Sequence, residues 1–144
     1  MYSGMLCVCH VLLDNDDAGK KSFEKAEKSG LLKVRDCTFV NCKGMSQSEF
    51  EDSLDVSIYE HAIFDEFGVE INKGSFRSSK KWSDRVQAVF QEQGKPWNEK
   101  IEADIKRLVS NSVKAMPGSA LNKHKRQSID ALVEALERMV SANK

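Results

Sequence analysis

The feature that most constrains the fold of this chain is an apolar run that ends abruptly in a group of acidic residues. The apolar residues are nearly continuous rather than alternating, which predicts a β-strand buried on both faces; they are Val8, Val11, Leu12 and Leu13. Such strands usually belong to parallel sheets covered by helices, and ligands bind at the carboxyl ends of those strands. The residues that follow this strand are therefore the first candidates for a functional site.

Two acidic residues after the strand, Asp14 and Asp16, are two positions apart, so in an extended chain their side chains point the same way. Two such carboxylates repel each other unless a proton or a cation joins them. Mg²⁺ is a natural occupant because it prefers carboxylate oxygens and keeps several of its waters. An ordinary turn is the alternative, with Asp17 as the N-cap of the next helix, and the sequence leaves both interpretations open.

Two other kinds of metal site fit the sequence less well. A calcium loop beginning at Asp14 would place Ala18 where an oxygen ligand is needed and Lys25 where the bidentate glutamate belongs. A zinc site is the second, but the cysteines lack the C-x₂-C spacing of structural zinc sites. We expect reduced thiols buried in the strands, and a packed or edge position for His10; the cysteines are Cys7, Cys9, Cys37 and Cys42.

Length and charge limit the class of protein. A chain of 144 residues corresponds to one domain with a real core. Its 22 basic and 22 acidic residues cancel, which argues against nucleic-acid binding by net charge alone and leaves room for local patches. Because neither a transmembrane run nor a secretory signal is recognisable, we expect a cytoplasmic protein that does not contact a membrane.

Hydrophobic periodicity and capping signals predict an α/β fold: a small parallel sheet of two or three strands, followed by a mostly helical carboxy-terminal half. We expect residues 1–72 to form the α/β core and residues 73–144 a helical extension packed on it as one structural unit. A capping box is expected at Ser46 and Glu49. The other expected elements are a helix over 18–30, a strand over 37–40, and helices over 56–67, 83–93 and 97–115, with a last helix after a basic segment at 123–126.

Further charged residues follow the second predicted strand. Glu51 lies just beyond it, at the edge of the sheet expected for Asp14 and Asp16, and is a candidate third carboxylate for a shared ion; a solvated helix face is the alternative. Lys80 or Lys81 could stabilise the charge that builds on a phosphoryl group, unless they form only a solvated basic turn. Three further cations could hold neighbouring phosphates: Lys73, Arg77 and Arg85.

Taken in order, these segments resemble a Toprim domain, the topoisomerase–primase fold of metal-dependent nucleases. The version found in the OLD family of ATP-dependent endonucleases, where it follows an ABC-type ATPase, is the most similar. The resemblance spans about Val8 to Trp97 and rests on the residues 14–20 (DNDDAGK), 30–32 (GLL), 43–45 (KGM), 48–52 (SEFED), 80–85 (KKWSDR) and 94–97 (GKPW).

The resemblance implies site residues, a cofactor and partners. It implies Asp14 and Asp16 as metal ligands, Glu51 as the third carboxylate with Glu49 and Asp52 as substitutes, and a lysine, Lys81 or Lys80, that assists cleavage. The implied chemistry is hydrolysis of a DNA phosphodiester by a water that two Mg²⁺ or Mn²⁺ ions activate. The implied partners are DNA and an ABC-type ATPase subunit or domain, and a homodimer is one expected assembly.

One departure from the family pattern concerns the residues before the first strand. A Toprim domain carries a glutamate on an earlier strand, and no acidic residue stands among residues 1–7. We therefore expect low activity unless a partner supplies that group, and an inactive binding or scaffold module is the alternative. Phosphotransfer domains fit less well, because Asp17-Ala18-Gly19 departs from the haloacid-dehalogenase pattern and the second strand ends in Asn41-Cys42 rather than in a phosphorylatable Asp.

Overall fold

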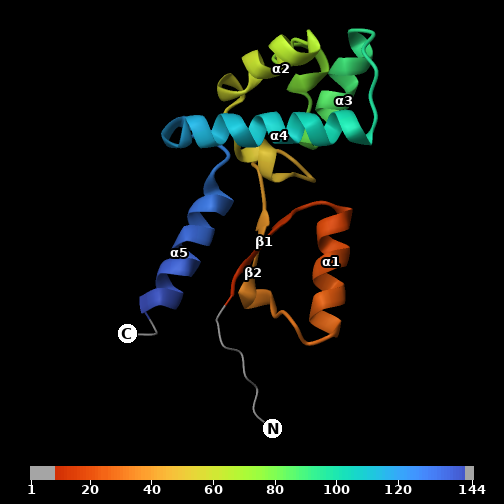
Figure 1. The fold of residues 1–144 in the computed structure, drawn as a ribbon. Helices are drawn as coiled ribbons and strands as arrows, with labels where there is room; N and C mark the ends of the chain where they lie inside the picture. The colour runs from red at the N-terminus through yellow and green to blue at the C-terminus, as the bar shows by residue number, and fades with distance from the viewer. Residues whose placement is uncertain (1–8, 142–144) are drawn as a thin grey trace.

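The computed structural model describes residues 9–141 as a parallel two-stranded sheet with helices around it (Figure 1). Helices α2 and α3 lie on one side of the long helix α4, and the sheet with α1 lies on the other (Figure 1). The elements are β1 (Val11–Asp14), α1 (Asp17–Lys28), β2 (Cys37–Val40), α2 (Glu60–Phe67), α3 (Trp82–Glu92), α4 (Glu99–Ala115) and α5 (Gln127–Ser141), with short 3₁₀ turns between them.

The two strands confirm the predicted α/β class and the parallel pairing. Val11 pairs with Cys37 and Asp14 with Val40, so both strands end at the same edge of the sheet. The prediction of complete burial was wrong, because the four residues of β1 are only partly buried. Within residues 9–141 the sheet has two strands. Each strand therefore has a neighbouring strand on one side and is less covered than a strand inside a wide parallel sheet. Val8 lies outside the described residues.

Helix α1 begins one residue earlier than the turn chemistry predicted. Asp16, not Asp17, is the N-cap, and its Oδ1 accepts a hydrogen bond from the Gly19 amide at 2.9 Å. The absence of a side chain at Gly19 allows the helix to approach the strand, because a Cβ there would lie 2.0 Å from the Asp14 carbonyl oxygen. The acidic turn therefore caps the helix as well as carrying candidate ligands.

The main hydrophobic core lies away from the sheet, around α4. Trp82 and Tyr59 are its largest fully buried side chains, and the Trp82 indole N–H donates to the Tyr59 hydroxyl at 3.1 Å. The core runs from Leu54 to Ala120 and so crosses the boundary at residues 72 and 73 that the sequence suggested. Trp82 opens α3, and its burial fixes the position of the residues beside it in the chain.

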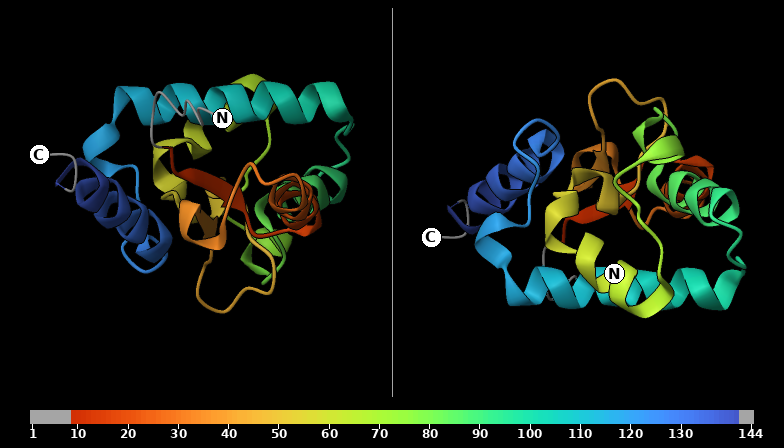
Figure 2. Two further views of the ribbon diagram at one scale, coloured as in Figure 1. Left: turned by 90° about the horizontal axis from the view of Figure 1, so that it is seen from below. Right: turned by 90° about the horizontal axis from the view of Figure 1, so that it is seen from above.

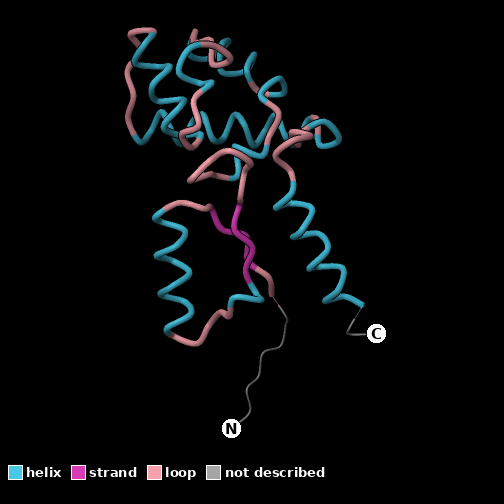
Figure 3. Tube along the Cα trace, turned by 180° about the vertical axis from the view of Figure 1, so that it is seen from behind, coloured by secondary structure: helices cyan, strands magenta, loops and turns pink. Residues whose placement is uncertain are grey.

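The helices over 83–93 and 97–115 agree with the prediction within a few residues, whereas the helix over 56–67 does not. Its first part is a 3₁₀ turn, Val56–Ile58, and α2 begins only at Glu60. Figure 2 and Figure 3 show α5 beside the sheet, on the other side from α1. Across residues 9–141, the helices are too short or too polar to span a lipid bilayer.

The cysteines and His10 lie in and around this small sheet. His10 Nε2 is 2.8 Å from the Thr38 hydroxyl and is partly buried, as expected of a packed histidine. Cys42 is buried, Cys37 is partly buried and Cys9 is exposed, so the expectation of buried thiols was wrong for Cys9. Cys7 lies outside the described residues.

Candidate functional site: a carboxylate cluster bridged by a lysine

The segment after β2 returns to the carboxyl end of β1. Asn15 and Ser48 exchange two backbone hydrogen bonds, of 2.8 and 3.0 Å. The Phe50 amide then donates to Asp14 Oδ1 at 2.8 Å. This pairing brings the acidic segment 49–52 against Asp14 and Asp16, as the parallel topology predicted.

Lys81 joins the two acidic segments. Its Nζ lies 2.9 Å from Asp16 Oδ2 and 3.1 Å from Glu49 Oε1. Burial alone would raise the pKa of Asp16, but hydrogen bonds from the Gly19 amide and Lys81 lower it below its ordinary value. Burial opposes the charge on Lys81 too, and its hydrogen bonds to both carboxylates raise its pKa nevertheless. Asp16 and Lys81 are therefore both charged at neutral pH.

Glu49 is held from the other side by the start of α3. The Ser83 amide donates to Oε2 at 2.7 Å and the Ser83 hydroxyl to Oε1 at 2.9 Å. The predicted capping box between Ser46 and Glu49 was therefore wrong: the Glu49 side chain accepts from α3, and its amide donates to Asp52 at 2.8 Å. Glu49, rather than Glu51, is the carboxylate that shares Lys81 with Asp16.

Arg85 has a structural role, which argues against its expected role in phosphate binding. The side chain is buried, and its guanidinium forms an ion pair with Asp52 and donates to the Phe76 carbonyl at 2.8 Å. Asp52 also accepts from the Trp82 amide at 3.1 Å. Asp52 and Arg85 thus fix the turn that presents Lys81, and the guanidinium is buried in contacts within the protein rather than displayed on the surface.

Two further groups surround the Asp14 carboxylate: Glu51 and Lys106. Burial raises the pKa of Asp14, and the nearby charges of Glu49 and Asp16 raise it further. Burial likewise raises the pKa of Glu51, while Lys106 opposes the shift. Lys106 comes from α4, forms an ion pair with Glu102 at 3.1 Å, and adds a positive charge on this side of the cluster.

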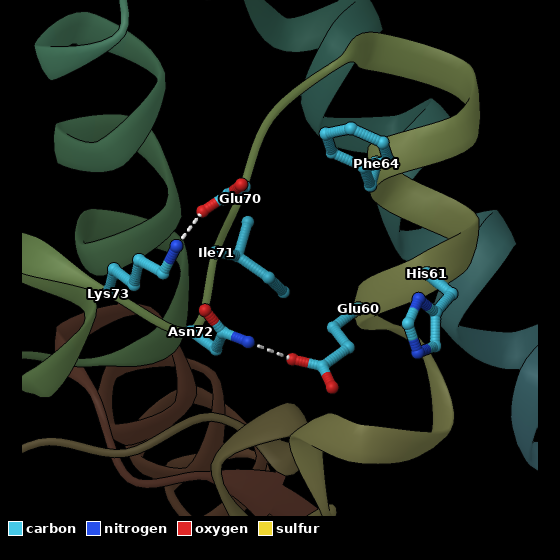
Figure 4. Close-up of a pocket in the computed structure, with 7 residues that line it drawn as sticks. All are labelled: Glu60, His61, Phe64, Glu70, Ile71, Asn72 and Lys73. Atoms are coloured by element: carbon cyan, nitrogen blue, oxygen red, sulfur yellow. Dashed lines mark hydrogen bonds and ion pairs between the residues drawn. The ribbon is translucent and has the colours of Figure 1, made fainter.

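The remaining predicted cations lie outside these contacts. Lys80 and Arg77 are exposed, and within residues 9–141 neither side chain forms an ion pair. Lys73 pairs with Glu70 on the rim of a separate cavity that also includes Glu60 (Figure 4). Of the two candidate catalytic lysines, only Lys81 contacts the carboxylates.

The carboxylate cluster consists of four carboxylates that lie near two ammonium groups: Asp14, Asp16, Glu49 and Glu51, with Lys81 and Lys106. Hard divalent ions prefer carboxylate oxygens. Asp14 Oδ2 accepts no hydrogen bond from the described residues and so has its lone pairs free for an ion. Among residues 9–141, however, no three His, Cys, Asp or Glu side chains are arranged closely enough to hold a metal ion. In this arrangement the Lys81 ammonium supplies the positive charge between Asp16 and Glu49.

Comparison with known proteins adds no family to this geometry: no protein-family model, curated protein or solved structure matches the chain.

Sequence reasoning missed two members of the site and underestimated a third. Ser83 carried no signal, because a serine in the first turn of a helix is commonplace. Lys106 stands far along the chain inside an amphipathic helix, where a lysine is ordinarily a solvated residue. Glu49 was named only as a substitute, since the capping-box pattern gave it a structural explanation.

Proposed function

We propose that this chain is a Toprim-type, metal-dependent endonuclease domain of the kind found in OLD-family nucleases, which hydrolyses DNA phosphodiesters. The observation that carries the proposal is the meeting of Asp14, Asp16 and Glu49 at the end of β1, with Lys81 between the last two. These residues come from three segments that are distant in the sequence, so their meeting is a property of the fold. An acidic turn that only caps a helix needs no lysine from a distant segment.

In this proposal Asp14 and Asp16 would hold Mg²⁺ or Mn²⁺, with Glu49 or Glu51 as the third ligand. When bound, such an ion would polarise the phosphodiester and lower the pKa of an attacking water. Lys81 would stabilise the negative charge that builds on the phosphoryl oxygens. Lys80 and Arg77, which are exposed on the segment leading to Lys81, would hold neighbouring phosphates.

The charge balance of the cluster supports this chemistry. Burial raises the pKa of Asp14, and the negative charges of Glu49 and Asp16 raise it further. A site with excess negative charge favours either a proton or a cation. A divalent ion would reduce this repulsion and so stabilise the folded protein. That gain in stability can be measured without an assay of catalysis.

The alternative is a binding module that keeps the fold without the chemistry and pairs with an ATPase. The observation that favours it is that Lys81 already neutralises part of the cluster and that both Glu49 oxygens accept hydrogen bonds from the protein. Such a module would need no metal to be stable.

A plasmid-nicking assay separates the two functions. Supercoiled plasmid would be incubated with the protein and Mg²⁺ or Mn²⁺, alongside Asp14→Asn and the control Asp130→Asn, which changes an exposed carboxylate on α5. Nicking by the wild type and the control, but not by Asp14→Asn, supports the nuclease. Equal nicking by all three proteins, or none by any of them, argues against it.

A further inference from the structure

A cavity of about 270 Å³ adjoins the carboxylate cluster. It lies between the turn that follows Glu49 and one side of α4. The residues that line it are Phe50, Glu51 and Leu54 from the turn and Lys106, Val109, Ser110 and Val113 from α4. None of the site residues predicted from the sequence, except Glu51, lines this cavity.

The lining divides into an apolar floor and a polar rim. Leu54 and Val109 are buried members of the main core and close the cavity from below. Phe50, by contrast, is 38% exposed, although an aromatic ring would normally be buried. Lys106 and Ser110 add hydrogen-bond donors at the rim. A flat ligand with an apolar face and a polar edge matches this lining.

The cavity and the carboxylate cluster belong to one local unit. The backbone of Phe50 donates to Asp14 at 2.8 Å, while the side chain of Phe50 lines the cavity. Glu51 follows directly and lines the cavity too, and Lys106 is electrostatically coupled to both Glu51 and Asp14. A molecule with a phosphate at the cluster would therefore present its next group to this cavity.

We propose that the cavity binds one unpaired nucleobase of a DNA strand whose backbone lies at the carboxylate cluster. The substrate is then single-stranded or locally unpaired DNA. Phe50 offers a ring on which a base can stack, and the donors of Lys106 and Ser110 face the base edge. A base inside a duplex reaches such a cavity only after it leaves its stack. This inference rests on the proposed function, which places the DNA backbone at the carboxylate cluster.

The test compares two short fluorescein-labelled strands, one carrying thymine bases and one built of abasic sites, by fluorescence anisotropy with Ca²⁺ as the divalent ion. Phe50→Ala removes the ring, and Ser110→Trp fills the cavity from an exposed rim position. The matched control is Asn111→Trp, which places the same side chain on the exposed neighbouring residue of α4, outside the lining. Circular dichroism checks that each variant is folded.

We expect the wild type and Asn111→Trp to bind the strand with bases about tenfold more tightly than the abasic strand. Phe50→Ala and Ser110→Trp should reduce that ratio to near one. Equal binding of the two strands by the wild type, or equal effects of the two tryptophan substitutions, overturns the inference. So does a wild type that binds neither strand.

The nicking assay keeps this inference distinct from the proposed function. Base-dependent binding without any nicking would reject the nuclease and retain the cavity as a base-binding site. Nicking of plasmid by a protein that binds both strands equally would reject the cavity and retain the nuclease.

Discussion

Replacing Lys81 with methionine tests the central contact of the site. The substitution keeps a long side chain and removes the ammonium group that lies 2.9 Å from Asp16 and 3.1 Å from Glu49. Both carboxylates are buried, so their negative charges would face each other without a counter-charge. The control is Lys80→Met, which makes the same change at an exposed neighbour.

The expected loss follows from burial and hydrogen bonding. Removing one partner of a buried ion pair costs about 3–5 kcal/mol, and Lys81 is 23% exposed, so we expect the lower end, about 3 kcal/mol. For a domain of this size that corresponds to a fall of about 10 °C in the melting temperature. Lys80→Met should change the free energy of unfolding by less than about 0.5 kcal/mol. Thermal and urea unfolding followed by circular dichroism would measure both.

The dependence on pH has a defined sign. Because the pKa of Asp16 is lowered in the folded protein, its contribution to stability is present at neutral pH and is lost as the pH falls through the folded pKa. Because the pKa of Lys81 is raised, its contribution persists until the pH rises through that folded pKa. The difference between wild type and Lys81→Met should therefore be largest near pH 7 and shrink below about pH 4.

Divalent ions give the same experiment a second readout. If the carboxylates bind Mg²⁺ or Mn²⁺, an ion at 100 times its Kd would restore about 2.7 kcal/mol to Lys81→Met. A variant as stable as Lys80→Met at pH 7 would refute the reasoning from buried charge. A destabilised variant that no divalent ion restores would instead count against the metal site and favour the binding module.

Three further substitutions test the support of the site. Asp52→Asn should lower the free energy of unfolding by about 3 kcal/mol in urea titrations, because the buried guanidinium of Arg85 loses its counter-charge. The control Asp130→Asn, at an exposed ion pair, should cost under about 1 kcal/mol. Similar losses in the two variants would contradict this reasoning. Glu51→Gln should stabilise the protein at pH 7 and not at pH 4, because burial raises the pKa of Glu51 and the wild type loses stability as the pH rises through it; a pH-independent difference would argue against a buried carboxylate. Gly19→Ala should cost about 3 kcal/mol or more, since a Cβ would collide with the carbonyl oxygen at the end of β1, while Gly118→Ala, in open space, serves as the control; equal melting temperatures would show that α1 can move away.

The pairing of the strands and the helices of the second half could be predicted from the sequence. The strand at Cys37–Val40 was predicted to the residue, since β-branched and aromatic residues dominate it. The helices over 99–115 and 127–141 follow the spacing of their apolar residues. These elements depend on local pattern and on burial of one face, both of which can be read along the chain.

The partners of the charged residues were decided only by the tertiary structure. Glu49, Asp52 and Arg85 stand within one acidic and one basic segment, and local chemistry could not tell which would be buried. Trp82 enters the core and thereby places Lys81 against Asp16 and Arg85 against Asp52. A charge is buried only where a counter-charge and hydrogen-bond donors from another segment meet it, and that meeting depends on long-range packing rather than on sequence spacing.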